Sequence, residues 1–113
     1  PEMGRNVEYV SFLQGDQTFI SVGGVLMRAI ELSAKLGQGD AEWLFENQEK
    51  LADCPEEVRY ILFPGTEWEH PNEARLWPYL YRTGKEEKKW GIYVLWLDFG
   101  FSRHARLVRP VVQ

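Results

Sequence analysis

One group of side chains that could in principle hold a metal ion is Glu67, Glu69 and His70, which lie close together in the sequence. On a strand, residues 67 and 69 would share one face while His70 points to the other, so the three would not converge on one ion. A solvated loop explains this group better. We therefore expect neither a metal site nor any other cofactor.

Cys54 is the only cysteine, which excludes an internal disulfide and a zinc site built from several cysteines. A nucleophilic thiol needs a base and an electropositive pocket beside it, and neither histidine is near Cys54 in the sequence. Its position between a helix end and Pro55 is better explained by a small apolar side chain that fills space. No pattern of residues indicates catalysis, so we expect a protein that is not an enzyme.

Arg103, Arg106 and Arg109 could contact phosphate groups. Strand alternation places Arg106 on the opposite face from the other two, which divides any basic stripe. Residues 58–113 carry 9 basic and 6 acidic side chains, against 4 and 11 in residues 1–57, and this excess is small for a surface that tracks phosphates. A single-stranded nucleic-acid-binding or regulatory module therefore stays only as the alternative function.

The aromatic residues give a stronger indication of function. Eleven of the sixteen fall between Tyr60 and Phe101. Alternate residues of a strand point to opposite faces, so segments 75–82 and 89–97 each divide into two lists. The lists assigned to the core are Leu76, Pro78 and Leu80 in the first segment and Trp90, Ile92, Val94 and Trp96 in the second.

The remaining lists form one outward surface if the two segments pair as a hairpin. The side chains that would then lie together are Trp77, Tyr79, Tyr81, Tyr93 and Leu95. Monomers seldom leave a large apolar patch in water without a use, and Tyr and Trp give much contact area at low entropy cost. We expect a ligand-binding face with Glu69, Arg75 and Arg82 on a polar rim. The alternative is that helices cover the sheet and make the same side chains part of the core.

Five strands and two helices are expected to position this face. The first helix runs from residue 21 to residue 36, where apolar side chains recur every three or four positions, and Gly37 ends it in a left-handed conformation. Asp40 caps the second helix, which ends before Pro55. The expected strands are residues 7–13, 59–63, 75–82, 89–97 and 105–112.

The composition is typical of one globular domain covering residues 1–113, with 44% hydrophobic and 27% charged side chains. No run of eighteen apolar residues exists, so no membrane span is expected. The first residues lack the basic and apolar segments of a secretory signal, and we interpret Pro1 and Glu2, ahead of Met3, as the remnant of an expression tag. The single cysteine fits a reducing compartment such as the cytoplasm.

Several motifs resemble those of a group of small uncharacterised bacterial proteins, and the resemblance covers nearly the whole chain. The motifs include LFPGTEW at 62–68, PYLY at 78–81, WLD at 96–98 and RLVRP at 106–110. In that group, fixed motifs are separated by positions that differ greatly between paralogues. This pattern looks like the variable proteins of diversity-generating retroelements, in which a mutagenic reverse transcriptase rewrites codons on a stable C-type-lectin-like scaffold.

The resemblance implies an α+β, C-type-lectin-like fold in which the N-terminal and C-terminal strands pair. It also implies a non-catalytic domain that displays a changeable aromatic face to a protein or other macromolecular ligand, with Trp90, Trp96 and Leu107 as scaffold. A calcium-dependent lectin would need six to eight oxygen ligands, and segments 69–73 and 96–98 offer too few.

The changeable positions that the resemblance implies overlap the outward face derived from alternation. They are Glu69, Arg75, Tyr79, Tyr81, Gly91, Tyr93, Leu95, Phe99, Gly100 and Ser102. The same positions without Gly100, together with Trp77, are the predicted ligand-binding residues.

Overall fold

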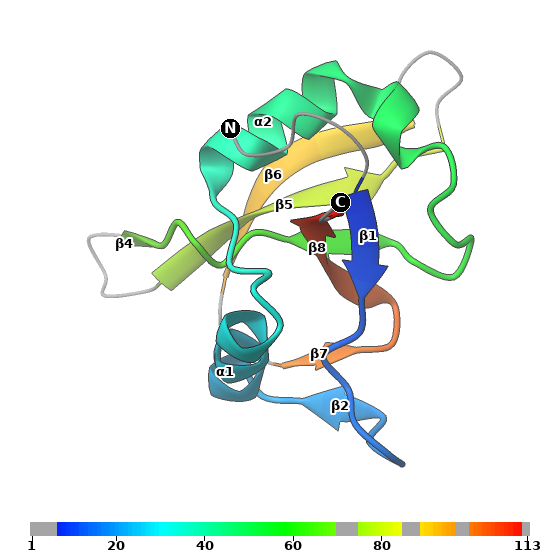
Figure 1. The fold of residues 1–113 in the computed structure, drawn as a ribbon. Coiled ribbons are helices and arrows are strands. Elements are labelled where there is room, and N and C mark those ends of the chain that lie inside the picture. Colours follow the sequence, from blue (N-terminus) through cyan, green and yellow to red (C-terminus); the bar gives the residue numbers. More distant parts are fainter. Residues whose placement is uncertain (1–6, 70–74, 85–88, 97–99, 112–113) are drawn as a thin grey trace.

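The computed structural model describes residues 7–69, 75–84, 89–96 and 100–111 (Figure 1). They form an α+β fold, as the sequence predicts. Its elements are β1 (Val7–Val10), β2 (Phe19–Ile20), α1 (Val22–Glu31), α2 (Gln38–Glu46), the 3-10 helix η1 (Gln48–Leu51), β3 (Tyr60–Leu62), β4 (Trp68–Glu69), β5 (Arg75–Arg82), β6 (Trp90–Trp96), β7 (Phe101–Ser102) and β8 (Ala105–Pro110).

Six of the strands form one mixed sheet, and β2 pairs with β7 in a separate small sheet. β1 pairs with β8 in the antiparallel sense, which confirms the predicted pairing of the N-terminal and C-terminal strands. β8 also pairs with β3 in the parallel sense, and β3 pairs with β5 in the antiparallel sense.

β5 has neighbours on both sides. Leu80 pairs with Ile61 of β3 and with Ile92 of β6, while Leu76 pairs with Trp68 of β4 and also with β6. β3 and β4 therefore follow one another along one side of β5, and β6 occupies the other side. Among the described strands, β6 is thus an edge of the sheet.

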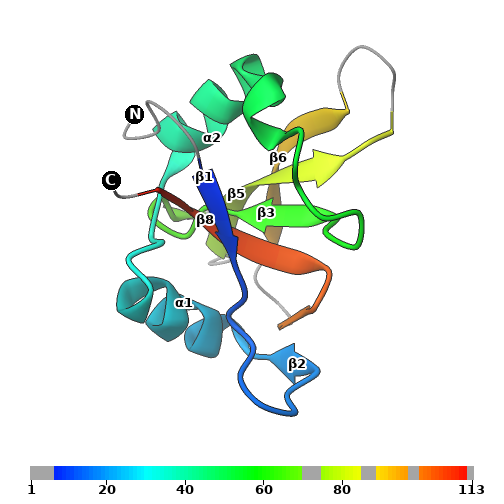
Figure 2. The same cartoon turned by 45° about the vertical axis from the view of Figure 1, so that its right-hand side comes forward.

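Two clusters of buried side chains lie on opposite faces of the sheet, with α2 on one side and α1 on the other (Figures 1 and 2). Alternation along β3 sends Ile61 to the α2 side and Leu62 to the α1 side. The α2-side cluster includes Leu44, Leu51, Ile61, Phe63, Leu80, Trp90 and Val108. The α1-side cluster includes Phe12, Val25, Ala29, Leu62, Trp77 and Leu107.

The first helix is shorter than its apolar pattern predicts. α1 ends at Glu31. The positive φ that was predicted for Gly37 is found at Ser33, where φ is 55°. The carbonyl of Leu36 accepts a hydrogen bond from the Gly65 N–H at 2.7 Å. Residues around position 36 are therefore held against the turn before β4 and do not extend the helix, which makes the predicted end at Gly37 wrong.

The second helix begins at Gln38, two residues before the predicted cap. Gly37 is its N-cap with an extended φ of −116°, and the Asp40 carboxylate accepts a hydrogen bond from the Gly37 N–H at 3.3 Å. The Thr66 hydroxyl accepts from the Gln38 N–H at 2.9 Å. Asp40 therefore stabilises the helix start from within its first turn.

The predicted hairpin is confirmed. β5 has the predicted bounds, and its register with β6 places Trp77 opposite Leu95, Tyr79 opposite Tyr93 and Tyr81 opposite Gly91. The remaining predicted strands are present but shorter, as Val7–Val10, Tyr60–Leu62, Trp90–Trp96 and Ala105–Pro110. The sequence did not predict η1 or the two-residue strands Phe19–Ile20, Trp68–Glu69 and Phe101–Ser102.

Candidate binding face

Four tyrosine side chains lie together on the α1 side of the sheet, and we call them the tyrosine face: Tyr60, Tyr79, Tyr81 and Tyr93. Tyr60 of β3 is opposite Tyr81 of β5, and Tyr79 of β5 is opposite Tyr93 of β6. The ring centroids are 5.2 Å apart for Tyr60 and Tyr81, 5.9 Å for Tyr60 and Tyr79, and 5.7 Å for Tyr79 and Tyr93. The rings therefore form one continuous chain of contacts across three strands.

Much of this surface is open to solvent. Tyr60 is 38% exposed, Tyr81 37% and Tyr93 47%, while Tyr79 is half-buried between them. Burial raises the pKa of Tyr79 above its ordinary value, and the neighbouring tyrosines raise it further. Its phenol therefore stays neutral at physiological pH. The neutral phenol can both donate and accept a hydrogen bond.

Trp77 is not part of the exposed surface, and its predicted place on the outward face was wrong. It is 1% exposed and stacks on Phe101, with ring centroids 6.2 Å apart and an angle of 13° between the planes. Its indole N–H donates to the Glu67 carboxylate at 3.1 Å. Alternation gave the correct face of β5, but Val25 and Ala29 of α1 pack with this end of it, so Trp77 belongs to the core.

The other predicted binding residues are distributed around the tyrosine face. Gly91 lies in β6, opposite Tyr81, and exposed Glu69 lies in β4, which pairs with the start of β5. Arg75 and Leu95 occupy β5 and β6, but their side chains, like Phe99 as a whole, lie outside the described residues. Ser102 is half-buried in the small β2–β7 sheet, so it does not share the six-stranded sheet with the tyrosines.

Two other face assignments need correction. Val94 was assigned to the core but is 50% exposed, because it lies on edge strand β6. Trp90, the first residue of β6, is buried as predicted. Arg82 was placed on the polar rim. Its guanidinium instead lies 4.7 Å from the centre of the Trp90 ring and donates to the carbonyls of Cys54 and Pro55, on the α2 side.

Tyr60 is the member of the face that sequence reasoning did not select. In β3 it alternates with Ile61, which is fully buried on the α2 side. That alternation was visible in the sequence. Its closeness to Tyr81 follows only from the pairing of β3 with β5, which joins segments separated by the β4 region.

A cavity of about 330 Å³ lies beside β6. It is lined by Gln38 and Glu42 of α2, by Pro78 of β5, and by Ile92, Tyr93 and Val94 of β6. Its lining is apolar on the sheet side and polar on the helix side. Tyr93 therefore borders both this groove and the tyrosine face.

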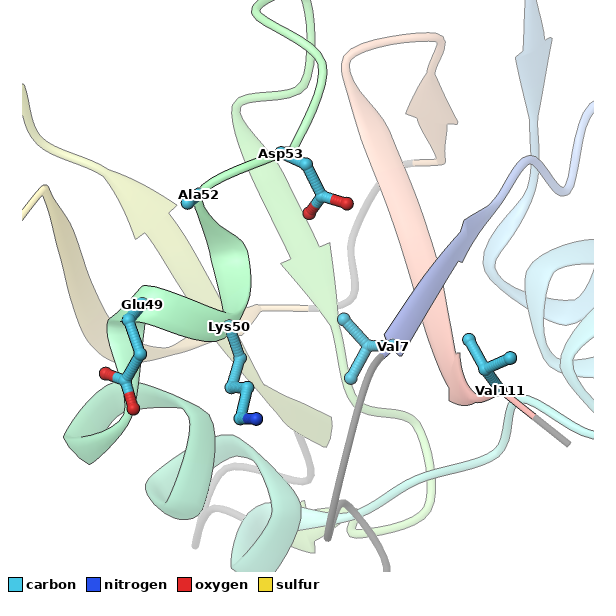
Figure 3. A pocket seen from close by; sticks show the side chains of 6 residues that line it. All are labelled: Val7, Glu49, Lys50, Ala52, Asp53 and Val111. Carbon is cyan, nitrogen blue, oxygen red and sulfur yellow. The ribbon is translucent and has the colours of Figure 1, made fainter. Parts of the chain in front are cut away.

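A second cavity, of about 480 Å³, lies near the other edge of the sheet (Figure 3). Val7 and Val111, the first and last described residues, line it together with Glu49, Lys50, Ala52 and Asp53 of the segment around η1. The Tyr9 hydroxyl, close by, is 3.4 Å from the Asp53 carboxylate, to which it donates. Burial raises the pKa of Tyr9 far above its ordinary value.

The residues considered for chemistry have structural surroundings. Cys54 is buried in the α2-side cluster, and burial raises the pKa of its thiol, which confirms its interpretation as an apolar filler. The His104 ring nitrogen Nδ1 is 3.0 Å from the Glu57 carbonyl oxygen. Within the described ranges, no three His, Cys, Asp or Glu side chains gather where they could hold a metal ion, and His70 lies outside those ranges.

The three arginines of the alternative hypothesis do not form a common surface. Arg106 makes an ion pair of 3.0 Å with Glu57. Arg109 pairs with Glu8 and donates to the Leu32 carbonyl at 2.6 Å, so it ties β8 to β1 and to the end of α1. Both guanidinium groups are thus engaged within the chain, while Arg103 is exposed.

The site thus combines a chain of tyrosine ring contacts on the sheet with a neighbouring groove that has one acidic wall. In comparisons of the chain with known proteins, no family model, no curated protein and no solved structure matches it.

Proposed function

We propose that this chain is a non-catalytic ligand-binding domain that contacts a protein or other macromolecular partner through its tyrosine face. The observation that carries the proposal is the chain of ring contacts between Tyr60, Tyr79, Tyr81 and Tyr93, with centroids 5.2 to 5.9 Å apart on an open part of the sheet. Large exposed aromatic groups on one surface are typical of protein-binding sites.

The physical properties of this surface support binding. Each ring is held against another, so little side-chain freedom is left to lose when a partner docks. The hydroxyl groups keep donors and acceptors at the ring tips, which lets the same surface make both apolar and hydrogen-bonded contacts. An open sheet surface that presents rings in this way suits a macromolecular surface better than a small ligand, which is normally enclosed in a pocket.

We further propose that the fold is C-type-lectin-like and that the face is changeable, as in the variable proteins of diversity-generating retroelements. The pairing of β1 with β8 and the position of both helices between β1 and β3 support this fold. The implied scaffold residues Trp90 and Leu107 are buried, whereas the implied changeable Tyr81 and Tyr93 are exposed. Trp96 lies in β6, with its side chain outside the described residues.

A binding experiment tests the proposed function. The purified chain, immobilised, is compared with the Tyr79→Ser/Tyr81→Ser/Tyr93→Ser variant for capture of proteins from cells of the source organism. Candidates are then produced separately and titrated. A matched control is Met27→Ser/Ile30→Ser, which removes two exposed apolar side chains from α1 and none from the tyrosine face. We expect the control to keep the captured partner and the triple variant to lose it at nearly unchanged thermal stability.

Two results would contradict the proposal. One is a collapse of the melting temperature in the triple variant, which would make the tyrosines core residues. The other is a partner that binds the triple variant as well as it binds the unchanged chain. Binding of oligo(dT) at low salt that both salt and the triple substitution abolish would favour the nucleic-acid alternative.

The genomic DNA tests the retroelement part separately. We expect a near-copy of the segment that encodes residues 79–109, differing mainly at adenines, and a neighbouring reverse-transcriptase gene. If this arrangement is absent, the chain remains a binding domain with a fixed face.

A further inference from the structure

The outer edge of β6 has backbone groups that the sheet does not use. Gln48 of η1 marks their direction: its side-chain amide donates to the Trp90 carbonyl at 3.0 Å, and its side-chain oxygen accepts from the Trp90 N–H at 3.1 Å. Gln48 does not belong to β5, so both backbone groups of Trp90 point away from β5. The N–H of Arg82, opposite Trp90, correspondingly donates to the Arg59 carbonyl on the far side of β5.

The same direction holds two and four residues further along β6, because backbone groups of a strand alternate with a period of two. Pro78 confirms this at Val94, its partner in the register. Pro78 has no N–H, and its carbonyl accepts from the Phe63 N–H at 3.1 Å on the other side of β5. The N–H and C=O groups of Ile92 and Val94 therefore point outward from the sheet.

Only the first of these three outward positions has a partner in the described part of the chain. Gln48 bonds to Trp90 as a neighbouring strand would, with one donor and one acceptor. No bond from another described residue reaches the outward groups of Ile92 or Val94. These two positions are about 7 Å apart along the strand, so together they can bond to a short extended segment.

The groove beside these positions indicates which segment would fit. Its floor is made by Pro78 and Ile92, with half-exposed Val94 at the rim. Glu42 forms its polar wall and accepts a hydrogen bond from the Gln38 side chain at 2.9 Å. An arginine or lysine side chain matches this lining, since its methylene groups can cover the apolar floor while its charge meets Glu42.

Charge disfavours a second copy of this chain as the occupant. β6 has no basic residue between Trp90 and Trp96, so antiparallel pairing of two β6 strands would bring no positive charge to the groove. It would also bring together the α2 helices of both copies, whose exposed carboxylates include Glu42 and Glu46. A basic segment of a different protein is complementary on both counts.

We propose that the edge of β6 at Ile92 and Val94 binds an extended segment of a partner protein by strand addition, with an arginine or lysine side chain of that segment in the groove beside Glu42. This mode of binding rests on the proposed binding function and names the class of partner. Side chains of an added strand alternate in direction, so the residues next to the basic one would reach toward Tyr93 and the tyrosine face.

Val94→Pro is the discriminating variant. The Val94 N–H points outward, so its loss removes a docking donor and leaves the β5–β6 hydrogen bonds intact, which is the setting in which edge strands accept proline. Val94→Thr is the matched control, because it alters the side chain and keeps the N–H. Glu42→Gln tests the charge of the groove. Tyr60→Ser/Tyr81→Ser alters the tyrosine face and leaves every residue of β6 unchanged.

The probe is a library of twelve-residue random peptides displayed on phage and selected on the unchanged chain. We expect enriched peptides that alternate β-formers with arginine or lysine. Val94→Pro should weaken their binding at least tenfold and Glu42→Gln several-fold, with little change in Val94→Thr. In the unchanged chain, amide exchange at Ile92 and Val94 should be fast without peptide and slow when such a peptide is bound. A loss of binding caused by misfolding of a variant would not produce this protection.

The outcomes separate this inference from the proposed function. Selected peptides that bind Val94→Pro unchanged, or a selection that enriches none, would overturn strand addition. If binding is lost only in Tyr60→Ser/Tyr81→Ser, the tyrosine face binds and the edge does not. Concentration-dependent dimers that Val94→Pro abolishes would show instead that a second copy occupies the edge.

Discussion

The ring of Tyr93 lies over Gly91, two residues earlier on the same strand. A Cβ atom on Gly91 would come within 2.7 Å of both the Tyr93 hydroxyl oxygen and its Cε2 atom. The obstacle is the end of a half-exposed side chain and not backbone, so the chain can accommodate a larger residue at 91 by moving the ring. Position 91 therefore controls where Tyr93 presents its hydroxyl group.

Gly91→Ala should displace the Tyr93 ring with little effect on folding. We expect a change in the free energy of unfolding below about 1 kcal/mol, because the ring can rotate into solvent and alanine is better suited to a strand than glycine. The aromatic NMR signals of Tyr93 should shift, and partner affinity should fall. Gly23→Ala is the control, since a Cβ there meets nothing within 4 Å, and an unchanged Tyr93 spectrum in Gly91→Ala would refute the coupling.

Trp77→Ala should be far more destabilising than a substitution on the tyrosine face. Removing this buried side chain leaves a cavity between α1 and the sheet, and such changes cost about 3–5 kcal/mol. Tyr81→Ala should cost about 1 kcal/mol, because it loses mainly one exposed ring contact. Urea denaturation followed by circular dichroism measures both. Equal losses would mean that Tyr81 is a core residue or that Trp77 is not.

Gln48→Ala should open the first outward position of β6. The substitution removes two hydrogen bonds to Trp90, each contributing about 1 kcal/mol, and leaves the Trp90 N–H without its partner. Hydrogen exchange by NMR should show a faster Trp90 amide and an unchanged Gly91 amide, which points to β5. If both amides accelerate equally, the whole strand has loosened and Gln48 has a wider structural role.

Stability should fall at alkaline pH through Tyr9 and Tyr79, in addition to Cys54, because burial also raises the pKa of its thiol. Burial raises the pKa of Tyr9 and of Tyr79 above the ordinary value of 10.0, so the unfolded chain loses these protons first. The stabilising difference is complete below about pH 10 and is lost as the pH rises further. Urea midpoints at about pH 9 and about pH 11 should therefore differ less in Tyr9→Phe than in the unchanged chain. Tyr79→Phe should reduce the difference less, and no reduction in either variant would contradict this account.

Local signals in the sequence were sufficient for some of this architecture. β5 and its hairpin with β6 were predicted because both segments are rich in β-forming residues and a polar, glycine-containing stretch of sequence separates them. The burial of Trp77 was not, since alternation gives the face of a strand but not the length of it that a helix covers. Tyr60 was missed for a related reason: its contacts with Tyr79 and Tyr81 depend on the pairing of β3 with β5.

The same limit explains the helix ends. The apolar spacing up to Leu36 continued past the helix because that stretch is buried for another reason, its contact with Gly65. Hydrophobic periodicity reports burial, and burial can come from a helix or from an irregular segment pressed against a turn. Gly37 was predicted to end the first helix in a left-handed conformation, but it is the extended N-cap of α2.

β5 is anchored at two points on opposite faces, by Trp77 in the α1-side cluster and by Leu80 in the α2-side cluster. The backbone position of the residues near these anchors is therefore set by residues other than themselves. We therefore expect that Tyr81 can be exchanged for a different amino acid while its Cα atom stays in place. If the tyrosine face binds a partner as proposed, such a strand can acquire a new specificity by single codon changes, and the evolution of recognition is then separated from the evolution of folding.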